Sequence, residues 1–150
     1  MSAATTRLLL FFKQFQRFYE HRFSPMLERT GLTMREVHVL LFLVNNPDCD
    51  TARDVAEYRG LVKSQVSQAV DLLAARGFLR RVPDTADRRV VHLSITETGA
   101  PLAREAQAIQ SSCGRRLLAR LSPEEESQFR RLLETVLENS DHLMEEEPTS

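Results

Sequence analysis

The chain has 150 residues, 42% of them apolar, and a formal net charge of −1. This length and composition suit one domain, over residues 1–150, with enough apolar side chains for a hydrophobic core. The near-zero charge excludes a protein that coats nucleic acid by general positive charge, so any such binding must come from a local cluster of basic residues.

The first predicted helix covers about residues 5–24. Its apolar and aromatic side chains recur at helical spacing and form a broad stripe, namely Leu8, Phe11, Phe12, Phe15, Phe18, Tyr19 and Phe23. A terminal helix of a small domain needs less aromatic surface than this. We therefore expect Leu8, Phe11 and Phe12 to pack against a second copy of the chain; the alternative is a helix that closes a monomeric core.

The next predicted feature is a helix-turn-helix. Residues 52–58 form a short predicted helix with Thr51 or Asp50 as its N-cap. A sharp turn follows at Gly60, and the second helix begins near Lys63. A small residue, a turn glycine and an apolar valine have the relative spacing of this motif: Ala56, Gly60 and Val66. The second helix of such a motif enters the major groove of DNA.

This second helix has two distinct faces. One face is apolar and is expected to pack on the core; it consists of Val62, Val66, Ala69, Val70 and Leu73. The other face carries short or amide polar side chains, namely Ser64, Gln65, Ser67, Gln68 and Asp71. These groups donate and accept hydrogen bonds, as the reading of base edges requires. Lys63 at the start of the helix, and Arg80 shortly after its end, are expected to bind phosphates.

A β-hairpin is predicted after this helix, with strands at residues 78–82 and 90–95. Its loop carries Arg88 and Arg89. A guanidinium is always charged and forks onto phosphate oxygens, so Arg88 is expected to enter the minor groove. Asp87 is expected to form a salt bridge with one of these arginines and, together with Arg89, to brace the loop. The hairpin thus predicts a wing that grips DNA beside the reading helix.

Several stretches of the chain carry a family resemblance: Leu32-Thr33, Asp54-Val55-Ala56, Ala75 to Arg81, Asp87-Arg88-Arg89 and Leu93 to Gly99. In this order and spacing they closely resemble the MarR family of bacterial and archaeal transcription regulators. The resemblance implies a mainly α protein with a small β-hairpin wing, in which residues 32–99 form a winged helix-turn-helix lobe and residues 5–24 and 100–146 form dimerisation helices. It also implies a homodimer that binds a pseudo-palindromic operator and is usually released by a small molecule, an oxidant or a metal. Family members often carry an arginine where this chain has Gln68.

Two further helices are predicted after the hairpin. Thr96 can cap a long helix that runs through Leu121, and Ser122 forms a capping box with Glu125 for the last helix. An apolar stripe on the last helix is expected to join the dimer interface: Leu132, Leu133, Val136, Leu137 and Leu143.

The resemblance also implies an effector site between the dimerisation helices and the DNA-binding lobe. The side chains expected to line it are Phe15, Tyr19, His38, Leu41 and Phe42. An apolar wall with a few polar groups suits a small aromatic molecule. Core packing is the alternative for the same residues.

Other classes of function lack their motifs in this sequence. There is no glycine-rich phosphate loop, no His-Glu-x-x-His and no nucleophile elbow, so we expect no catalytic residue and no cofactor. The 4 histidines are not paired at ligand spacing, which predicts no metal site. Cys49 and Cys113 give no disulfide framework, although Cys113 is an alternative redox sensor. The apolar run before Lys13 is too short to span a membrane, so a cytoplasmic protein without a membrane partner is expected.

Positive charge gathers where DNA binding needs it, because the stretch from Arg53 to Arg89 has eight basic and five acidic residues. The sequence therefore predicts a sequence-specific DNA-binding transcription regulator. We expect a homodimeric, ligand-responsive repressor whose partner is double-stranded DNA. The alternatives are a winged-helix module that binds a protein, and a redox-sensing regulator that acts through Cys113.

Overall fold

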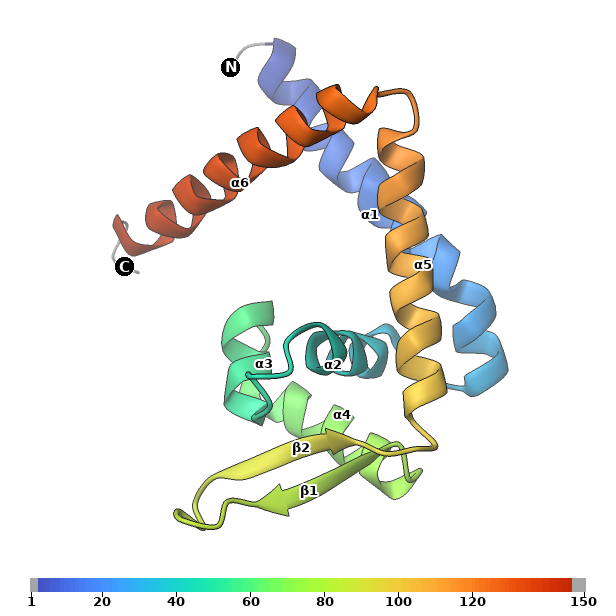
Figure 1. Ribbon diagram of the computed structural model, residues 1–150, viewed down its shortest axis with the longest axis vertical. Helices are drawn as coiled ribbons and strands as arrows, with labels where there is room; N and C mark the ends of the chain where they lie inside the picture. The colour runs from blue at the N-terminus through green and yellow to red at the C-terminus, as the bar shows by residue number, and fades with distance from the viewer. Residues whose placement is uncertain (1–2, 147–150) are drawn as a thin grey trace. The chain divides into compact units, whose positions relative to one another are not determined.

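The computed structural model describes residues 3–146, with side chains described for residues 3–143. The elements in this range, in chain order, are α1 (Ala3–Thr30), α2 (Met34–Asn45), α3 (Ala52–Arg59), α4 (Lys63–Ala75), β1 (Leu79–Pro83), β2 (Val91–Ile95), α5 (Ala100–Leu118) and α6 (Pro123–Glu146) (Figure 1). The expected class, mainly α with one β-hairpin, is confirmed. Within these residues no helix combines the length and the apolar composition that crossing a bilayer requires.

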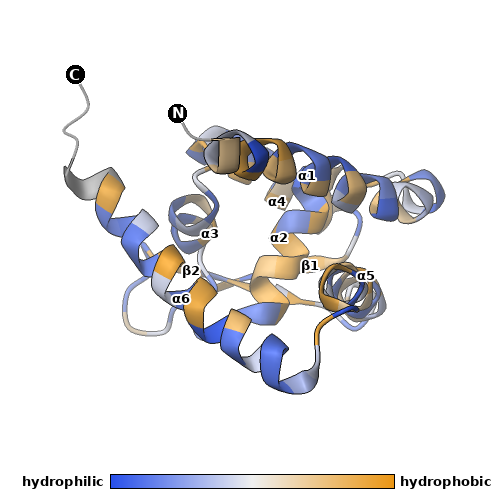
Figure 2. Cartoon of the chain, turned by 90° about the horizontal axis from the view of Figure 1, so that it is seen from above, coloured by the Kyte–Doolittle hydropathy of each residue, from blue (hydrophilic) through white to orange (hydrophobic). Residues whose placement is uncertain are grey.

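The chain divides into two compact units within α5, one ending at Cys113 and the other beginning at Gly114. The first unit contains α1 to α4, the hairpin and most of α5. The second contains the end of α5 and all of α6, whose hydrophobic and hydrophilic residues alternate in bands along the helix (Figure 2). The expected boundaries of a lobe at residues 32–99 and of dimerisation helices at 5–24 and 100–146 stay predictions.

The core of the first unit is built around α2. Eight of the 12 residues of this helix are apolar, and Val37, Val39, Leu40 and Leu41 are completely buried. It contacts α1, α3, α4 and β2. Burial of each such side chain contributes about 1.5–3 kcal/mol, so α2 is the element on which the neighbouring elements are placed.

Local signals in the sequence explain where the helices begin. The Glu36 carboxylate accepts a hydrogen bond from the Thr33 N–H at 2.7 Å, which closes the start of α2. At α3 the Thr51 hydroxyl accepts from the Asp54 N–H at 3.2 Å, and the Asp54 carboxylate accepts from the Thr51 N–H at 3.0 Å. Thr51, rather than Asp50, is therefore the N-cap of α3.

The turn of the helix-turn-helix depends on a left-handed residue. Gly60 has φ 59°, a conformation that costs glycine little, and its N–H bonds to the Ala56 carbonyl. The predicted apolar face of α4 is confirmed for Val66, Ala69, Val70 and Leu73, which are buried. It is wrong for Val62, which is 62% exposed, because this residue is the extended N-cap of α4 and lies outside the helical repeat.

Three element boundaries differ from the sequence prediction. The first helix runs on to Thr30, past Pro25, because Phe23 and Met26 on either side of the proline are buried and hold the helix in place. The long helix after the hairpin ends at Leu118 instead of Leu121. The strands lie at Leu79–Pro83 and Val91–Ile95, one residue later at three of their four ends than predicted.

The open end of the hairpin is joined to the start of α5 by backbone and side-chain hydrogen bonds. β1 pairs antiparallel with β2, from Leu79 opposite Ile95 to Pro83 opposite Val91. The Thr96 N–H donates to the Phe78 carbonyl at 3.1 Å, and the Thr96 hydroxyl accepts from the Gly99 N–H at 3.1 Å just before α5. The predicted capping role of Thr96 is thus confirmed.

We predict that Gly99→Ala destabilises the protein. A Cβ at Gly99 would lie 2.2 Å from the backbone oxygen of Phe78, and backbone cannot move aside as a flexible side chain can. Overpacking of this kind costs about 1–3 kcal/mol. Urea unfolding at one fixed protein concentration measures the change.

Gly114→Ala is the matched control, because a Cβ at this position of α5 meets nothing within 4 Å. Alanine is the better helix former, so this variant should gain up to about 1 kcal/mol. Equal effects of the two substitutions would show that the close approach of Gly99 to Phe78 does not constrain the fold.

Candidate nucleic-acid interface

Most of the polar face of α4 has no partner among the described residues, although its Asp71 forms an ion pair with Arg81. Lys63, Ser64, Ser67 and Gln68 are exposed and Gln65 is partly exposed, while the opposite side of the helix is buried. Among residues 3–143 no hydrogen bond or ion pair engages these five side chains. Their donors and acceptors are therefore available to a ligand that approaches this face.

The two arginines of β1 differ in their surroundings. Arg81 forms an ion pair with Asp71 of α4, which links the hairpin to α4 and offsets the charge of Arg81. Arg80 is exposed and has no partner among the described residues. Only Arg80 of this pair thus keeps an uncompensated guanidinium.

The loop between β1 and β2 extends away from the helices of the first unit (Figure 1) and is held by two aspartates. The Asp84 carboxylate accepts from the N–H groups of Ala86 at 3.0 Å and Asp87 at 2.9 Å. Asp87 in turn accepts from the Arg89 backbone N–H at 3.0 Å and from its Nε at 3.1 Å. The hydrogen bond from the Arg89 side chain lowers the pKa of Asp87, so this carboxylate stays ionised.

The structure thus contains the expected salt bridge, and it joins Asp87 to Arg89. Arg88 lies between these two residues in the chain, is exposed, and has no partner within the described part of the molecule. The loop therefore presents one free guanidinium on a framework of fixed backbone hydrogen bonds.

Sequence reasoning missed a charged cluster at the base of this loop. His92 of β2 bonds through Nδ1 to Asp50 at 2.7 Å and through Nε2 to Asp84 at 2.8 Å. The pKa of Asp84 is lowered to about 2, mainly because its carboxylate is hydrogen-bonded to His92. The partners lie 42 and 8 residues from His92, so no local pattern could have joined them; the only signal was the turn-forming character of Asp84.

The residues predicted to line an effector pocket have different environments. Leu41 is completely buried and Phe42 is 2% exposed, so both belong to the core. Phe15, Tyr19 and His38 are partly exposed. The expected pocket stays a prediction. For Leu41 and Phe42 the structure agrees with the alternative, which is packing in the core.

Tyr19 ends a chain of side-chain amides. Gln107 donates to Asn45 at 2.9 Å, Asn45 donates to Gln110 at 3.0 Å, and Gln110 donates to the Tyr19 hydroxyl at 3.2 Å. Burial raises the pKa of Tyr19, and burial together with the charge of Arg59 lowers that of His38 to about 4. Tyr19 and His38 are therefore neutral polar groups near a cation at physiological pH.

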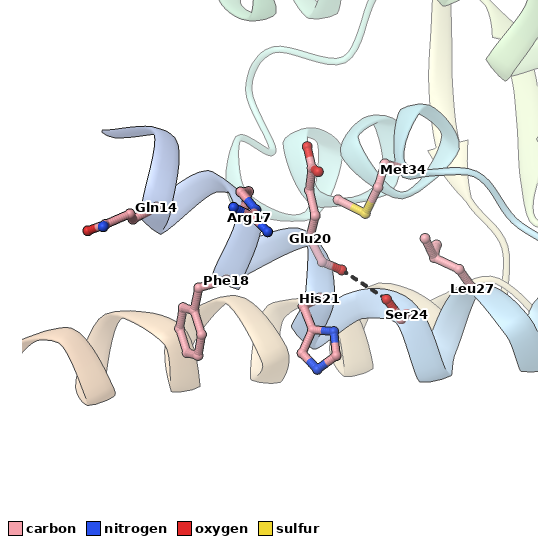
Figure 3. Close-up of a pocket in the computed structure, with 8 residues that line it drawn as sticks. All are labelled: Gln14, Arg17, Phe18, Glu20, His21, Ser24, Leu27 and Met34. Carbon is pink, nitrogen blue, oxygen red and sulfur yellow. Dashed lines mark hydrogen bonds between the residues drawn. The ribbon is translucent and has the colours of Figure 1, made fainter. Parts of the chain in front are cut away.

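A separate hollow of about 760 Å³ lies along α1 (Figure 3). Its lining comes from α1 and the start of α2 and shares no residue with the predicted pocket: Gln14, Arg17, Phe18, Glu20, His21, Ser24, Leu27 and Met34. Five of these side chains are polar and three are apolar, and the Ser24 hydroxyl donates to the Glu20 carbonyl at 3.4 Å.

Each unit leaves apolar side chains in solvent where the sequence predicts a dimer interface. On α1 the exposed fractions are 53% for Leu8, 37% for Phe11 and 57% for Phe12. On α6 the same holds for the predicted stripe, namely Leu132, Leu133, Val136, Leu137 and Leu143. Contiguous exposed apolar surface of this kind marks an interaction site.

The cysteines and histidines give little support to redox or metal sensing. Cys113 is 1% exposed, and a buried thiol in apolar surroundings is usually unreactive. Cys49 is partly exposed and free. Among the described residues no three His, Cys, Asp or Glu side chains are grouped so that they could hold a metal ion.

A helix-turn-helix made of α3 and α4, followed by a two-stranded hairpin, defines a winged helix-turn-helix protein. Comparisons with known proteins agree with this class. A family model described as the MarR family matches residues 30–90. The transcriptional repressor Rv2887 of Mycobacterium tuberculosis is 27% identical over 113 residues, which cover 75% of this chain and 81% of the relative.

Solved structures superpose on most of the chain. CouR of Rhodococcus jostii, bound to p-coumaroyl-CoA, is 26% identical with a TM-score of 0.72 and covers 91% of this chain and 95% of its own. MepR of S. aureus in complex with DNA is 23% identical, with a TM-score of 0.73. The alignment covers 92% of this chain and 99% of the MepR chain. The chain is thus similar to transcription regulators of the MarR family, in sequence over residues 30–90 and in fold over most of its length.

We predict that His38 makes the folded protein less stable in acid. Its folded-state pKa is about 4, below the ordinary 6.5 of the unfolded chain, so the unfolded state binds the proton first as pH falls. The stability contributed by neutral His38 is complete above about pH 6.5 and is lost between that value and about pH 4. Urea midpoints measured across this range should fall in the wild type and fall less in His38→Gln.

His21→Gln is the control for this measurement, since His21 is an exposed histidine of α1. It should keep the wild-type dependence on pH. The same slope in His38→Gln as in the wild type would contradict a neutral His38 in the folded state.

Proposed function

We propose that this protein is a repressor that binds a pseudo-palindromic operator as a homodimer and leaves it when a small aromatic effector binds. The observation that carries the proposal is the mostly unpartnered polar face of α4 beside a braced loop with a free Arg88. Repression is supported by relatives such as Rv2887, which are named transcriptional repressors. The proposal includes no catalytic residue and no cofactor, and it keeps the expected cytoplasmic location.

The proposed division of labour follows the chemistry of the two surfaces. On α4 the hydroxyl and amide groups read base edges in the major groove: Ser64, Gln65, Ser67 and Gln68. Lys63 and Arg80 bind phosphates, and Arg88 enters the minor groove. Asp87 and Arg89 hold the loop that presents Arg88. The MepR structure, which is a complex with DNA, supports a duplex as the partner of this fold.

Dimerisation is proposed through both ends of the chain. The exposed apolar residues of α1 and α6 would be covered by a second copy, which buries surface that no described residue of either unit covers. A dimer also places two reading helices on one operator. Half-sites one helical turn apart, about 10–10.5 base pairs, would then be bound together.

The proposed effector site lies around Phe15, Tyr19 and His38, which are partly exposed. Tyr19 and His38 supply polar groups, and Arg59 is near enough for its charge to act on both. CouR was solved with p-coumaroyl-CoA, which supports an aromatic ligand class. We expect the effector to bind preferentially to a dimer whose two α4 helices are wrongly spaced for DNA. Such an effector weakens DNA binding, and DNA must then weaken effector binding by the same factor.

The competing function is a winged-helix module that binds a protein through the same face. For binding to a polyanionic duplex, the logarithm of the binding constant falls steeply and linearly with the logarithm of the salt concentration. Protein recognition through neutral amides would show no such dependence on salt, so a salt titration against duplex DNA separates the two.

We predict that Gln68→Ala lowers specificity. The amide can pair with adenine through two hydrogen bonds, so its loss should cost about 1–3 kcal/mol on an operator selected from genomic fragments and much less on scrambled duplex. Gln128→Ala, which removes an exposed amide on α6, should change neither affinity. Equal losses on the two duplexes would disprove a base-reading role for Gln68.

In contrast to Gln68→Ala, Arg88→Ala should weaken binding without changing specificity. It removes a free charge aimed at phosphates, so binding to operator and scrambled duplex should weaken together and the salt slope should become shallower by about one ion. Asp87→Ala should be a weaker version of Arg88→Ala if Asp87 braces the loop. Arg130→Ala, on α6 in an ion pair with Glu126, is the matched control. Unchanged affinities and slope in Arg88→Ala would exclude contact between the wing and DNA.

We predict a dimer at micromolar concentration in sedimentation velocity. Phe12→Glu combined with Leu132→Glu should shift the protein to a monomer, because each change puts a charge into the proposed interface. Val62→Ser alters an exposed apolar residue outside α1 and α6 and should leave the dimer intact. A folded, soluble monomer of the unaltered chain would contradict the proposal.

A further inference from the structure

The base of the wing is closed by one histidine between two carboxylates. Both ring nitrogens of His92 are engaged, Nδ1 with Asp50 at 2.7 Å and Nε2 with Asp84 at 2.8 Å. Asp50 lies in the loop before α3, and Asp84 follows β1 at the start of the wing loop. The imidazole therefore links the first helix of the helix-turn-helix with the wing.

This geometry sets the protonation state of the ring. A carboxylate only accepts hydrogen bonds, and a neutral imidazole has a single N–H to donate. Two carboxylates bonded to the two nitrogens therefore require an imidazolium. The hydrogen bonds to Asp50 and Asp84 raise the pKa of His92 above its ordinary 6.5.

Among the described residues, no titratable group other than Asp50 and Asp84 acts on the ring. β1 places Val82 opposite His92, and α2 and α3, which also contact β2, supply no titratable side chain that acts on it. Within the described residues the charges that face the imidazolium are those of Asp50 and Asp84. Loss of the ring proton would leave these carboxylates with one donor between them.

Each carboxylate carries the effect of His92 further. The second oxygen of Asp84 holds the N–H groups of Ala86 and Asp87, and thereby the part of the loop that presents Arg88. Asp50 directly precedes Thr51, the N-cap of α3. Its backbone carbonyl accepts a hydrogen bond from the Leu93 N–H at 2.7 Å. The cluster of His92, Asp50 and Asp84, called here the wing clamp, thus fixes the loop relative to α3.

We propose that protonated His92 is a positioning residue that holds the wing in its DNA-binding arrangement, so that affinity for DNA falls as pH rises and the wing clamp loses its proton. This inference rests on the proposed DNA binding by the wing. Because the folded-state pKa of His92 is the higher one, the contribution of the clamp is complete below about pH 6.5 and is lost as pH rises through the folded-state value.

The protonation of His92 can be tested without DNA. Two-dimensional NMR of the ring nitrogens in the intact, nitrogen-15-labelled protein should show both nitrogens of His92 protonated at about pH 6.5, with titration above that value. His92→Gln assigns the signal. A neutral ring with one acceptor nitrogen at that pH would overturn the wing clamp, whatever the outcome of DNA binding.

The consequence for DNA is measured with a fluorescent mixed-sequence duplex at low salt, between about pH 6 and about pH 8.5. We expect the wild type and the control His21→Gln to lose about threefold to tenfold in affinity as pH rises, since the clamp contributes charge-assisted hydrogen bonds at a partly exposed site. His92→Gln should bind more weakly at the acid end and respond less to pH. A His92→Gln profile parallel to that of the wild type would overturn the proposal.

Asp50→Asn separates the wing clamp from simple attraction between charges. Loss of a negative charge alone would tighten binding to a polyanion, whereas loss of a clamp partner should weaken binding at about pH 6.5. Tighter binding would overturn the positioning role. If the wild type bound no duplex at any pH, the proposed function would fail together with the DNA role of His92, and the NMR titration would still decide whether the clamp exists.

Discussion

The apolar contact between α2 and α4 is the constraint on which the rest of the structure depends. α4 buries Val66, Ala69, Val70 and Leu73, and this commits its opposite face to solvent. The amides and hydroxyls of that face then have no partner within the described residues. Because the core is close-packed, the reading helix cannot rotate without losing several buried side chains. A rigid orientation is what recognition of base edges requires.

The wing is placed by charge where the reading helix is placed by apolar burial. Carboxylates occupy the joints of the hairpin: Asp71 pairs with Arg81, Asp84 with His92, and Asp87 with Arg89. These pairs are exposed or partly exposed, so each contributes little stability. Their effect is geometric, since they use up the charges of some basic residues and leave Arg80 and Arg88 free.

Features governed by neighbouring residues could be predicted from the sequence. Thr51 with Asp54, Gly60, and the buried face of α4 from Val66 onwards are all local signals, and the structure contains them. Features that depend on distant partners could not be predicted. The continuation of α1 past Pro25 depends on burial of Phe23, and the site of His92 depends on Asp50, which lies 42 residues away. Leu41 and Phe42 are apolar, which fits both the wall of a pocket and a core. In the structure they lie in the core.

Chemical footprinting of a selected operator tests the central claim most directly, because it reports major and minor grooves separately. With the unaltered protein, guanine N7 atoms should be protected from methylation in two half-sites about 10–10.5 base pairs apart, or a multiple of this. Hydroxyl-radical cleavage should be suppressed in the minor groove that flanks each half-site, where Arg88 would lie. Minor-groove protection without any protection of major-groove guanines, on operators that contain guanine in both half-sites, would contradict a reading role for α4.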